Sequence, residues 1–127
     1  MQPPIILVAE DDETLRYLAR RQIAALGLLC DLAEDGNQAV EQALKNEYGL
    51  ILMDLQMPNM NGLEATAAIR KNEAKTGKKS YTPIIAMTAN PDKAACLEAG
   101  MNDFIFKPVL LHDLDKMVKR WLAKQNG

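Results

Sequence analysis

Charged and hydroxyl side chains follow four apolar runs of the chain, at the points where buried segments should end. In chain order they are Glu10, Asp11, Asp12, Asp54, Thr88 and Lys107. Carboxylates about 4 Å apart repel by roughly 4 kcal/mol at an effective dielectric constant of about 20, so a cation is needed to hold them together. Carboxylate oxygens suit Mg²⁺, which often shares its coordination shell with phosphate. We therefore predict a Mg²⁺ site, with Mn²⁺ as an alternative ion.

Asp54 is the candidate nucleophile, because the apolar run before it would hold its carboxylate rigidly beside the metal. Lys107 would neutralise a transferred phosphoryl group, and Thr88 would hydrogen-bond it. Each residue alone has an ordinary explanation, since acidic residues after strands often cap helices and threonine commonly ends a strand. The prediction of phosphoryl chemistry therefore rests on the whole set.

Five short aliphatic or β-branched runs predict the strands that position these residues. They are Ile5–Ala9, Leu28–Ala33, Leu50–Met53, Pro83–Met87 and Phe104–Phe106. The second run carries Asp31 and is expected at a sheet edge. Helical periodicity follows over residues 15–26, 39–44, 63–70 and 110–122. The lysine-rich segment 70–82 is expected to be a solvated loop.

The alternation of strands and helices predicts an α/β fold, a doubly wound five-stranded parallel sheet with helices on both faces. A parallel strand pair needs a crossover connection, and the intervening helix supplies it. Ligands of such sheets bind beyond the carboxyl ends of the strands. The predicted fold therefore brings the polar residues to one edge.

Composition limits the other possibilities. The 127 residues are 48% hydrophobic and 25% charged with a net charge of −2, which predicts one globular domain over residues 1–127. The chain lacks the basic excess expected of direct nucleic-acid binding, and its apolar runs are too short to cross a membrane. We expect a cytoplasmic protein without membrane contact. Cys30 and Cys96 are expected to be free thiols.

Four stretches, ILVAEDD, LMDLQMPNMNG, PIIAMTAN and FIFKP, resemble the receiver domain of response regulators in two-component signalling. The resemblance covers essentially the whole chain. The sequence of the stretch around Asp54 is most similar to receivers of hybrid sensor histidine kinases. It implies the flavodoxin-like strand order 2-1-3-4-5. It also implies a phosphorelay in which a sensor histidine kinase or a histidine phosphotransfer protein passes a phosphoryl group to this chain.

The same resemblance implies roles for individual residues. Asp54 would accept the phosphoryl group, Thr88 and Lys107 would contact its oxygens, and Thr88 and Phe104 would act as the switch. The metal ligands would be Glu10, Asp11, Asp54 and the backbone carbonyl of Gln56. The chain would not be an enzyme beyond phosphorylating and dephosphorylating itself, and any kinase activity of a hybrid protein would lie outside it.

Two assignments involve a choice of register. The acidic pair could be Glu10 with Asp11 or Asp11 with Asp12; an apolar strand that ends before Glu10 favours the first and leaves Asp12 to open a helix. Phe104 is preferred to Phe106 as the switch because the aromatic residue of the family lies three positions before its lysine. Either ring could instead fill the core.

The chain departs from the family between Thr88 and Lys107, where the spacing of 19 positions is shorter than usual. We expect a short fourth helix, with Asn90 as its cap and Pro91 in its first position. Less surface would then be available for pairing, so we expect a monomer that relays its phosphoryl group through contacts near the first helix, around Leu15 and Leu18.

Three rival functions remain for comparison. A phosphatase of the haloacid-dehalogenase type needs a second aspartate two positions after the first, where this chain has Gln56. A nucleotide-binding module needs a glycine-rich phosphate loop, and none follows a predicted strand. A degenerate receiver, which binds proteins independently of phosphorylation, is the strongest alternative.

Overall fold

The computed structural model describes residues 4–77, 81–89 and 92–126. In chain order its elements are β1 (Ile5–Ala9), α1 (Glu13–Ala25), β2 (Leu29–Ala33), α2 (Gly36–Lys45), β3 (Leu50–Asp54), α3 (Gly62–Thr76), β4 (Ile84–Thr88), α4 (Lys93–Ala99), β5 (Asp103–Phe106) and α5 (Leu111–Asn126). Strands and helices alternate, as predicted. Each predicted strand is present to within about a residue at either end, and β3 extends one residue further to include Asp54.

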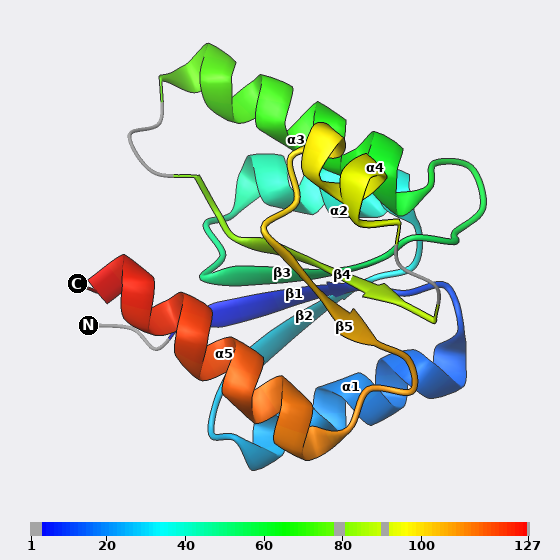
Figure 1. Ribbon diagram of the computed structural model, residues 1–127, viewed down its shortest axis with the longest axis vertical. Helices are drawn as coiled ribbons and strands as arrows, with labels where there is room; N and C mark the ends of the chain where they lie inside the picture. Colours follow the sequence, from blue (N-terminus) through cyan, green and yellow to red (C-terminus); the bar gives the residue numbers. More distant parts are fainter. Residues whose placement is uncertain (1–3, 78–80, 90–91, 127) are drawn as a thin grey trace.

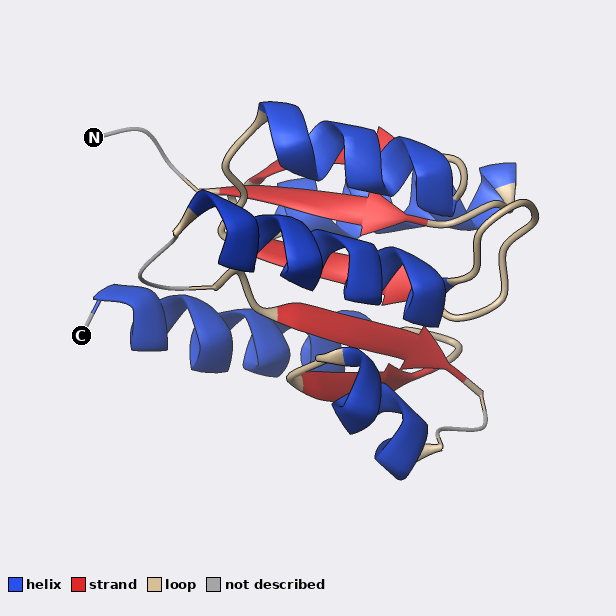
Figure 2. Cartoon of the chain, turned by 90° about the horizontal axis from the view of Figure 1, so that it is seen from above, coloured by secondary structure: helices blue, strands red, loops and turns tan. Residues whose placement is uncertain are grey.

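The strands form one parallel sheet in the order β2-β1-β3-β4-β5, which confirms the predicted doubly wound fold. Helices α2, α3 and α4 cover one face, and α1 and α5 cover the other (Figure 1). The strand arrows all point the same way in Figure 2, so the carboxyl ends of the strands meet at one edge. Strand β2, which carries Asp31, lies at an edge of the sheet as expected.

The central strands are buried on both faces, which explains why they appear in the sequence as continuous apolar runs. On β3, Leu50 and Leu52 pack with α1 and α5, whereas Ile51 and Met53 pack with the helices of the opposite face. Successive side chains of a strand point to opposite faces, so each residue of the run has a core to enter. Each large aliphatic side chain buried in this way contributes about 1.5–3 kcal/mol. This packing makes the end of β3 a rigid support.

Helix α3 is longer than the periodicity predicts. It continues from the expected segment to Thr76 and ends at Gly77, whose φ of 72° is left-handed. The first half of the lysine-rich segment is therefore helical, and the prediction of a loop over 70–82 was wrong there. Its residues are mostly charged and polar, and the two that are largely buried, Arg70 and Glu73, pair with each other at 2.6 Å, so no apolar stripe marks this part of the helix.

Helix α4 has 7 residues and is short, as expected. Its N-cap is Asp92, whose side chain accepts a hydrogen bond from the amide of Ala95 at 3.1 Å. The predicted cap, Asn90, was therefore wrong; Asn90 and Pro91 lie outside the described residues. The helix ends at Gly100, which has a left-handed φ of 105°.

The loop after β3 is held tightly against the strand. A Cβ atom at Gly62 would overlap the carbonyl oxygen of Asp54, so only glycine lets α3 begin this close to the strand end. Asn61 caps the helix: its side chain accepts from the Glu64 amide at 2.9 Å, and the Glu64 side chain accepts from the Asn61 amide at 3.1 Å. Asp54 is thus fixed from both its strand and the following loop.

Candidate functional site

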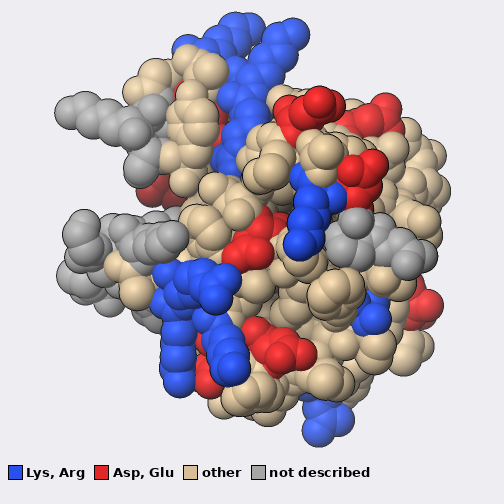
Figure 3. Space-filling model, viewed as in Figure 1, with Lys and Arg blue, Asp and Glu red and all other residues tan. Residues whose placement is uncertain are grey.

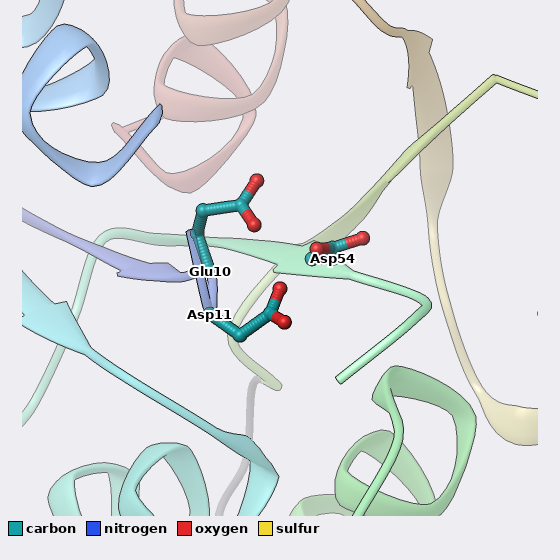
Figure 4. A group of neighbouring side chains, drawn as sticks. All are labelled: Glu10, Asp11 and Asp54. Atoms are coloured by element: carbon teal, nitrogen blue, oxygen red, sulfur yellow. The ribbon is translucent and has the colours of Figure 1, made fainter. Parts of the chain in front are cut away.

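The polar residues predicted from the strand ends gather at the carboxyl edge of the sheet. Glu10 and Asp11 follow β1, Asp54 ends β3, Thr88 ends β4 and Lys107 follows β5. Figure 4 shows Glu10 and Asp11 at the end of β1, with Asp54 beside them on β3. Because β1 and β3 are direct neighbours in the sheet, their ends bring these carboxylates together.

Asp54 presents a buried carboxylate with a separate partner for each oxygen. The residue is 4% exposed. Its Oδ1 accepts a hydrogen bond from the backbone amide of Gln56 at 3.2 Å, and its Oδ2 lies 3.1 Å from Lys107 Nζ. The amide of Leu55 donates to Met87 on β4 at 3.4 Å, which ties the strand end to its neighbour. The carboxylate is therefore held in one orientation.

Lys107 connects the two buried carboxylates. Its backbone amide donates to the carbonyl of Thr88 at 2.9 Å, and the peptide bond to Pro108 is cis. From there Nζ reaches Glu10 Oε1 at 2.8 Å and Asp54 Oδ2 at 3.1 Å. Burial alone would lower the pKa of Lys107, but its hydrogen bonds to Glu10 and Asp54 outweigh burial and raise the pKa. The ammonium group therefore stays charged.

Glu10 is the second buried carboxylate. Its Oε2 accepts from the Asp12 amide at 3.2 Å, and its Oε1 accepts from Lys107. Burial, followed by the neighbouring Asp54 carboxylate, raises the pKa of Glu10 above the ordinary value of 4.5. A raised pKa means that the site disfavours its own negative charge, as expected where a cation should bind.

Asp11 is exposed, and its carboxylate faces the same space. Ligand oxygens of Glu10, Asp11 and Asp54 all lie within 4.8 Å of one another. The carboxylate of Asp12 is used elsewhere: it caps α1 by accepting from the Leu15 amide at 3.0 Å. This geometry favours Glu10 with Asp11 as the acidic pair.

The three carboxylates fit a small divalent cation. Mg²⁺ binds oxygen ligands at about 2.0–2.1 Å, so two oxygens on one ion lie at most about 4.2 Å apart. The ligand oxygens lie within 4.8 Å of one another, so at most a small contraction is needed, and water commonly completes the shell of this ion. Hard oxygen donors match the chemistry of Mg²⁺ or Mn²⁺. The backbone carbonyl of Gln56 as a further ligand stays a prediction.

Thr88 and Phe104 lie on the two strands next to the site. Thr88 is buried at the end of β4 and pairs in register with Phe106, whereas Phe104 pairs with Ala86. The Phe104 ring is half-buried against the core beneath α4, and its centroid is 5.4 Å from that of Phe106 in an edge-to-face arrangement. Phe106 is mostly exposed. Of the two rings, Phe104 is the one that packs against the core, and its role as the switch stays a prediction.

Three contacts around the site were not anticipated from the sequence. Arg16 reaches back from α1 to the loop after β1. Lys93 Nζ lies 5.0 Å from the centre of the Phe104 ring. Asn59 has a left-handed φ of 68° and donates to Asp35 at 3.1 Å. Of these three contacts, only that of Asn59 could have been suspected from the sequence, since asparagine in a turn often adopts the left-handed conformation.

An apolar groove of about 340 Å³ runs from the site between α1 and the segment after β5. Leu15 and Leu18 line it from α1, where they are 37% and 45% exposed. Pro108 and Val109 line the opposite wall. Glu10 and Lys107 also contribute to the lining, so the groove opens directly onto the charged site.

Basic and acidic side chains lie in several small groups that alternate over the face shown in Figure 3. Among residues 4–77, 81–89 and 92–126, every helix is too short or too polar to span a lipid bilayer.

Both described cysteines, Cys30 and Cys96, are free thiols.

Comparison with known proteins identifies the family. Residues 6–119 match the family model described as response regulator receiver domain. Hybrid signal transduction histidine kinase G of Dictyostelium discoideum is 42% identical over 121 residues, which cover 91% of this chain and 3% of that protein. The chain also spans only 6% and 12% of the hybrid kinases B and F of the same organism.

Two solved structures are similar over nearly the whole chain. The receiver domain of sensor histidine kinase PA1611 from Pseudomonas aeruginosa PAO1, with a magnesium ion coordinated in its active-site cleft, has a TM-score of 0.85 at 37% identity and covers 96% of this chain and 99% of its own. The co-crystal structure of the Saccharomyces cerevisiae histidine phosphotransfer protein Ypd1 and the receiver domain of Ssk1 gives a TM-score of 0.88 at 32% identity, covering 98% and 94%. Because the family model matches most of the length of this chain, the chain belongs to the response regulator receiver domains of two-component signalling.

Proposed function

We propose that Asp54 accepts a phosphoryl group from a phosphohistidine, with Mg²⁺ held by Glu10, Asp11 and Asp54. The observation that carries this proposal is the Asp54 carboxylate itself. It is buried, its two oxygens are held by the Gln56 amide and by Lys107, and it lies beside two further carboxylates. A carboxylate so restrained is a preorganised nucleophile.

In the transfer, an Asp54 oxygen forms a bond to phosphorus while the bond between phosphorus and the donor's imidazole nitrogen breaks. The electron pair of the broken bond stays on the imidazole, which takes up a proton from water. Bound Mg²⁺ would neutralise charge on the transferring phosphoryl group. Lys107 Nζ, already 3.1 Å from Asp54 Oδ2, would hydrogen-bond one phosphoryl oxygen, and the Thr88 hydroxyl another.

The response to phosphorylation would pass through Thr88 and Phe104. When the Thr88 hydroxyl turns toward the phosphoryl group, the space beside β4 becomes available to the Phe104 ring. That ring is half-buried and in contact with Lys93 of α4, so its inward movement would change the surface around α4.

The phosphoryl donor is a sensor histidine kinase or a histidine phosphotransfer protein, and it would dock in the groove beside α1. Exposed Leu15 and Leu18 offer an apolar surface that continues to Glu10 and Lys107. A helix carrying the phosphohistidine could therefore bury apolar side chains in the groove while the imidazole lies over the site. We further propose that residues 1–127 form one receiver domain that acts on no other substrate.

No observation favours the alternative of a degenerate receiver, and the presence of Asp54, Thr88 and Lys107 at neighbouring strand ends supports the proposal over it. The test is transfer from a phosphorylated histidine phosphotransfer protein in the presence of Mg²⁺. The wild type should gain one phosphoryl group that base or hydroxylamine removes, whereas Asp54→Asn should gain none. Asp113→Asn, an exposed aspartate of α5, is the matched control and should behave like the wild type. Equal labelling of Asp54→Asn would overturn the assignment.

Docking is tested separately from chemistry. Leu18→Asp should slow transfer from the protein donor but leave phosphorylation by acetyl phosphate unchanged, because the small donor does not use the groove. Leu44→Asp places the same charge on an exposed leucine of α2, on the opposite face, and should affect neither reaction. If Leu18→Asp and Leu44→Asp transfer at the same rate, the groove is not the docking surface.

A further inference from the structure

Arg16 folds back from the exposed side of α1 over the loop that carries the acidic pair. Its Nη1 donates hydrogen bonds to the carbonyl oxygens of Glu10 at 2.8 Å and Asp11 at 2.9 Å. Its Nη2 lies 3.5 Å from Glu34 Oε1 at the start of the next loop. The side chain is only 14% exposed, although its neighbours on the helix surface face solvent. The guanidinium is therefore part of the site and not of the solvated surface.

The two carbonyls belong to consecutive residues that each place a carboxylate at the metal site. Glu10 and Asp54 have side-chain partners of their own, in Lys107 and in backbone amides. In the part of the chain that the structure describes, no group hydrogen-bonds the carboxylate of Asp11. The direction of that carboxylate therefore depends on the backbone. Arg16 holds this backbone through the Glu10 carbonyl, which precedes the Asp11 Cα, and through the Asp11 carbonyl, which follows it.

The contact with Glu34 is of less weight. The Glu34 side chain is 63% exposed, and an exposed ion pair at 3.5 Å is weak. Gln38 holds Glu34 from α2, with hydrogen bonds of 2.9 and 3.2 Å, so this carboxylate steadies the guanidinium from outside. The bonds to the two carbonyls are shorter, at 2.8 and 2.9 Å, and the one to Glu10 is partly buried, so they hold the guanidinium more firmly than the contact with Glu34.

We propose that Arg16 is a positioning residue for the divalent-cation site: it fixes the peptide groups of Glu10 and Asp11 so that the Asp11 carboxylate points at the ion. This inference rests on the proposed function, because it assumes that the acidic cluster binds Mg²⁺. Groups that orient metal ligands from outside the coordination shell commonly change metal affinity by 10–100-fold when they are removed.

The sign of the effect separates positioning from simple electrostatics. Arg16 carries a positive charge close to a cation site, and the loss of that charge alone should strengthen Mg²⁺ binding. The loss of the two carbonyl bonds should weaken it, because Asp11 would then have to be ordered by the ion itself. Weaker binding after Arg16→Ala is thus a result that charge alone does not produce.

The experiment measures Mg²⁺ affinity of the unphosphorylated protein by titration calorimetry, and repeats it with Mn²⁺ by electron paramagnetic resonance. Arg16→Ala should raise the Kd by about 10–100-fold. Arg16→Lys keeps the charge and a shorter donor, so it should recover part of the affinity and also serves if the alanine variant folds poorly. Arg20→Ala removes an exposed arginine one turn further along α1 and should leave the Kd unchanged.

A second readout follows phosphorylation by acetyl phosphate as Mg²⁺ is increased. Arg16→Ala should need more Mg²⁺ for half of its maximal rate, while the rate at saturation approaches that of the wild type. An unchanged or lower Kd in Arg16→Ala, with the wild type binding Mg²⁺, overturns the role of Arg16 alone. A wild type that binds neither ion overturns the proposed metal site and this inference together.

Discussion

The ammonium nitrogen of Lys107 lies 2.8 Å from Glu10 Oε1, nearer than to the proposed acceptor Asp54, from which it is 3.1 Å away. One cation thus bridges the ends of β1, β3 and β5. Both carboxylates are buried, so their mutual repulsion would be costly without it. When Mg²⁺ is absent, Lys107 is the charge that keeps the site together.

Removal of that charge should destabilise the metal-free protein. Lys107→Met leaves two buried carboxylates unpaired, and we expect a loss of about 2 kcal/mol, less than for a fully buried pair because water reaches the site. Lys107 is 24% exposed, which supports this lower figure. Urea unfolding in EDTA measures the loss, and added Mg²⁺ should recover more stability in the variant than in the wild type.

Lys119→Met is the matched control for Lys107→Met. Lys119 pairs with Asp115 on α5 at the same distance of 3.1 Å, but its side chain is 76% exposed. Exposed pairs of this kind contribute little, so its stability should stay close to that of the wild type. Equal losses in the two lysine variants would contradict the special role of Lys107.

The raised pKa of Glu10 predicts how stability depends on pH. In the window between 4.5 and the higher pKa of the folded state, folded Glu10 keeps a proton that the unfolded chain has released. This contribution to stability is therefore fully present below pH 4.5 and is lost as the pH rises through the folded-state pKa. Unfolding of the metal-free protein should show this dependence, and Glu10→Gln should remove it.

Glu13→Gln provides the comparison for that pH series. Glu13 is exposed in the first turn of α1, so its substitution removes one glutamate from the chain without removing a carboxylate of the site. Each variant lacks one glutamate, so the difference between their free energies of unfolding at each pH removes the contribution of the carboxylates that both variants share. If Glu10→Gln and the wild type have parallel stability curves, Glu10 does not titrate as proposed.

Thr66 lies on the buried face of α3, and its hydroxyl leads to a prediction about stability. It is fully buried, and its hydroxyl has no hydrogen-bond partner among the described residues. Thr66→Val keeps the shape and removes the unsatisfied group, so we expect the free energy of unfolding to rise by about 1 kcal/mol. Thr76→Val is the control, because its hydroxyl donates to the Glu73 carbonyl at 3.1 Å and should give no gain. A loss of stability in Thr66→Val would contradict the prediction.

The short α4 predicts that activation does not produce a dimer. A specific dimer needs roughly 800 Å² from each partner, and a helix of 7 residues offers little of it. Light scattering after size exclusion, with and without beryllofluoride as phosphoryl mimic, should report a monomer in both states. A mimic-dependent dimer that Lys93→Ala or Leu97→Ala breaks would show that α4 is an interface after all.

Much of the fold and the placement of the site residues follow from simple patterns. Apolar runs buried on both faces are hard to mistake, and parallel strands bring Glu10, Asp54 and Lys107 to one edge whatever the details of the loops. The second half of α3 escaped prediction because its charged and polar residues, the buried pair Arg70 and Glu73 included, look the same in a loop and in a helix. Only Gly77, which takes the left-handed conformation after the helix, marked its end.

The contacts that orient the site are less visible. Arg16 binds backbone carbonyls, and backbone atoms leave no trace in the residue types, so the residue looks like any other arginine on a polar helix face. Asp92 and Asn90 are equally good caps by residue type, so the sequence alone does not show that the side chain of Asp92 caps α4. The cytoplasmic location and the monomeric state stay predictions.

The identity of the phosphorylated residue tests the central proposal most directly. The protein is phosphorylated with acetyl phosphate and Mg²⁺, reduced with borohydride, which converts an aspartyl phosphate to homoserine, and mapped by peptide mass spectrometry. We predict homoserine at position 54 and at no other aspartate, and none when EDTA replaces Mg²⁺. Homoserine at Asp11 or Asp12, or a phosphoryl group that survives base at any position, would contradict Asp54 as the acceptor.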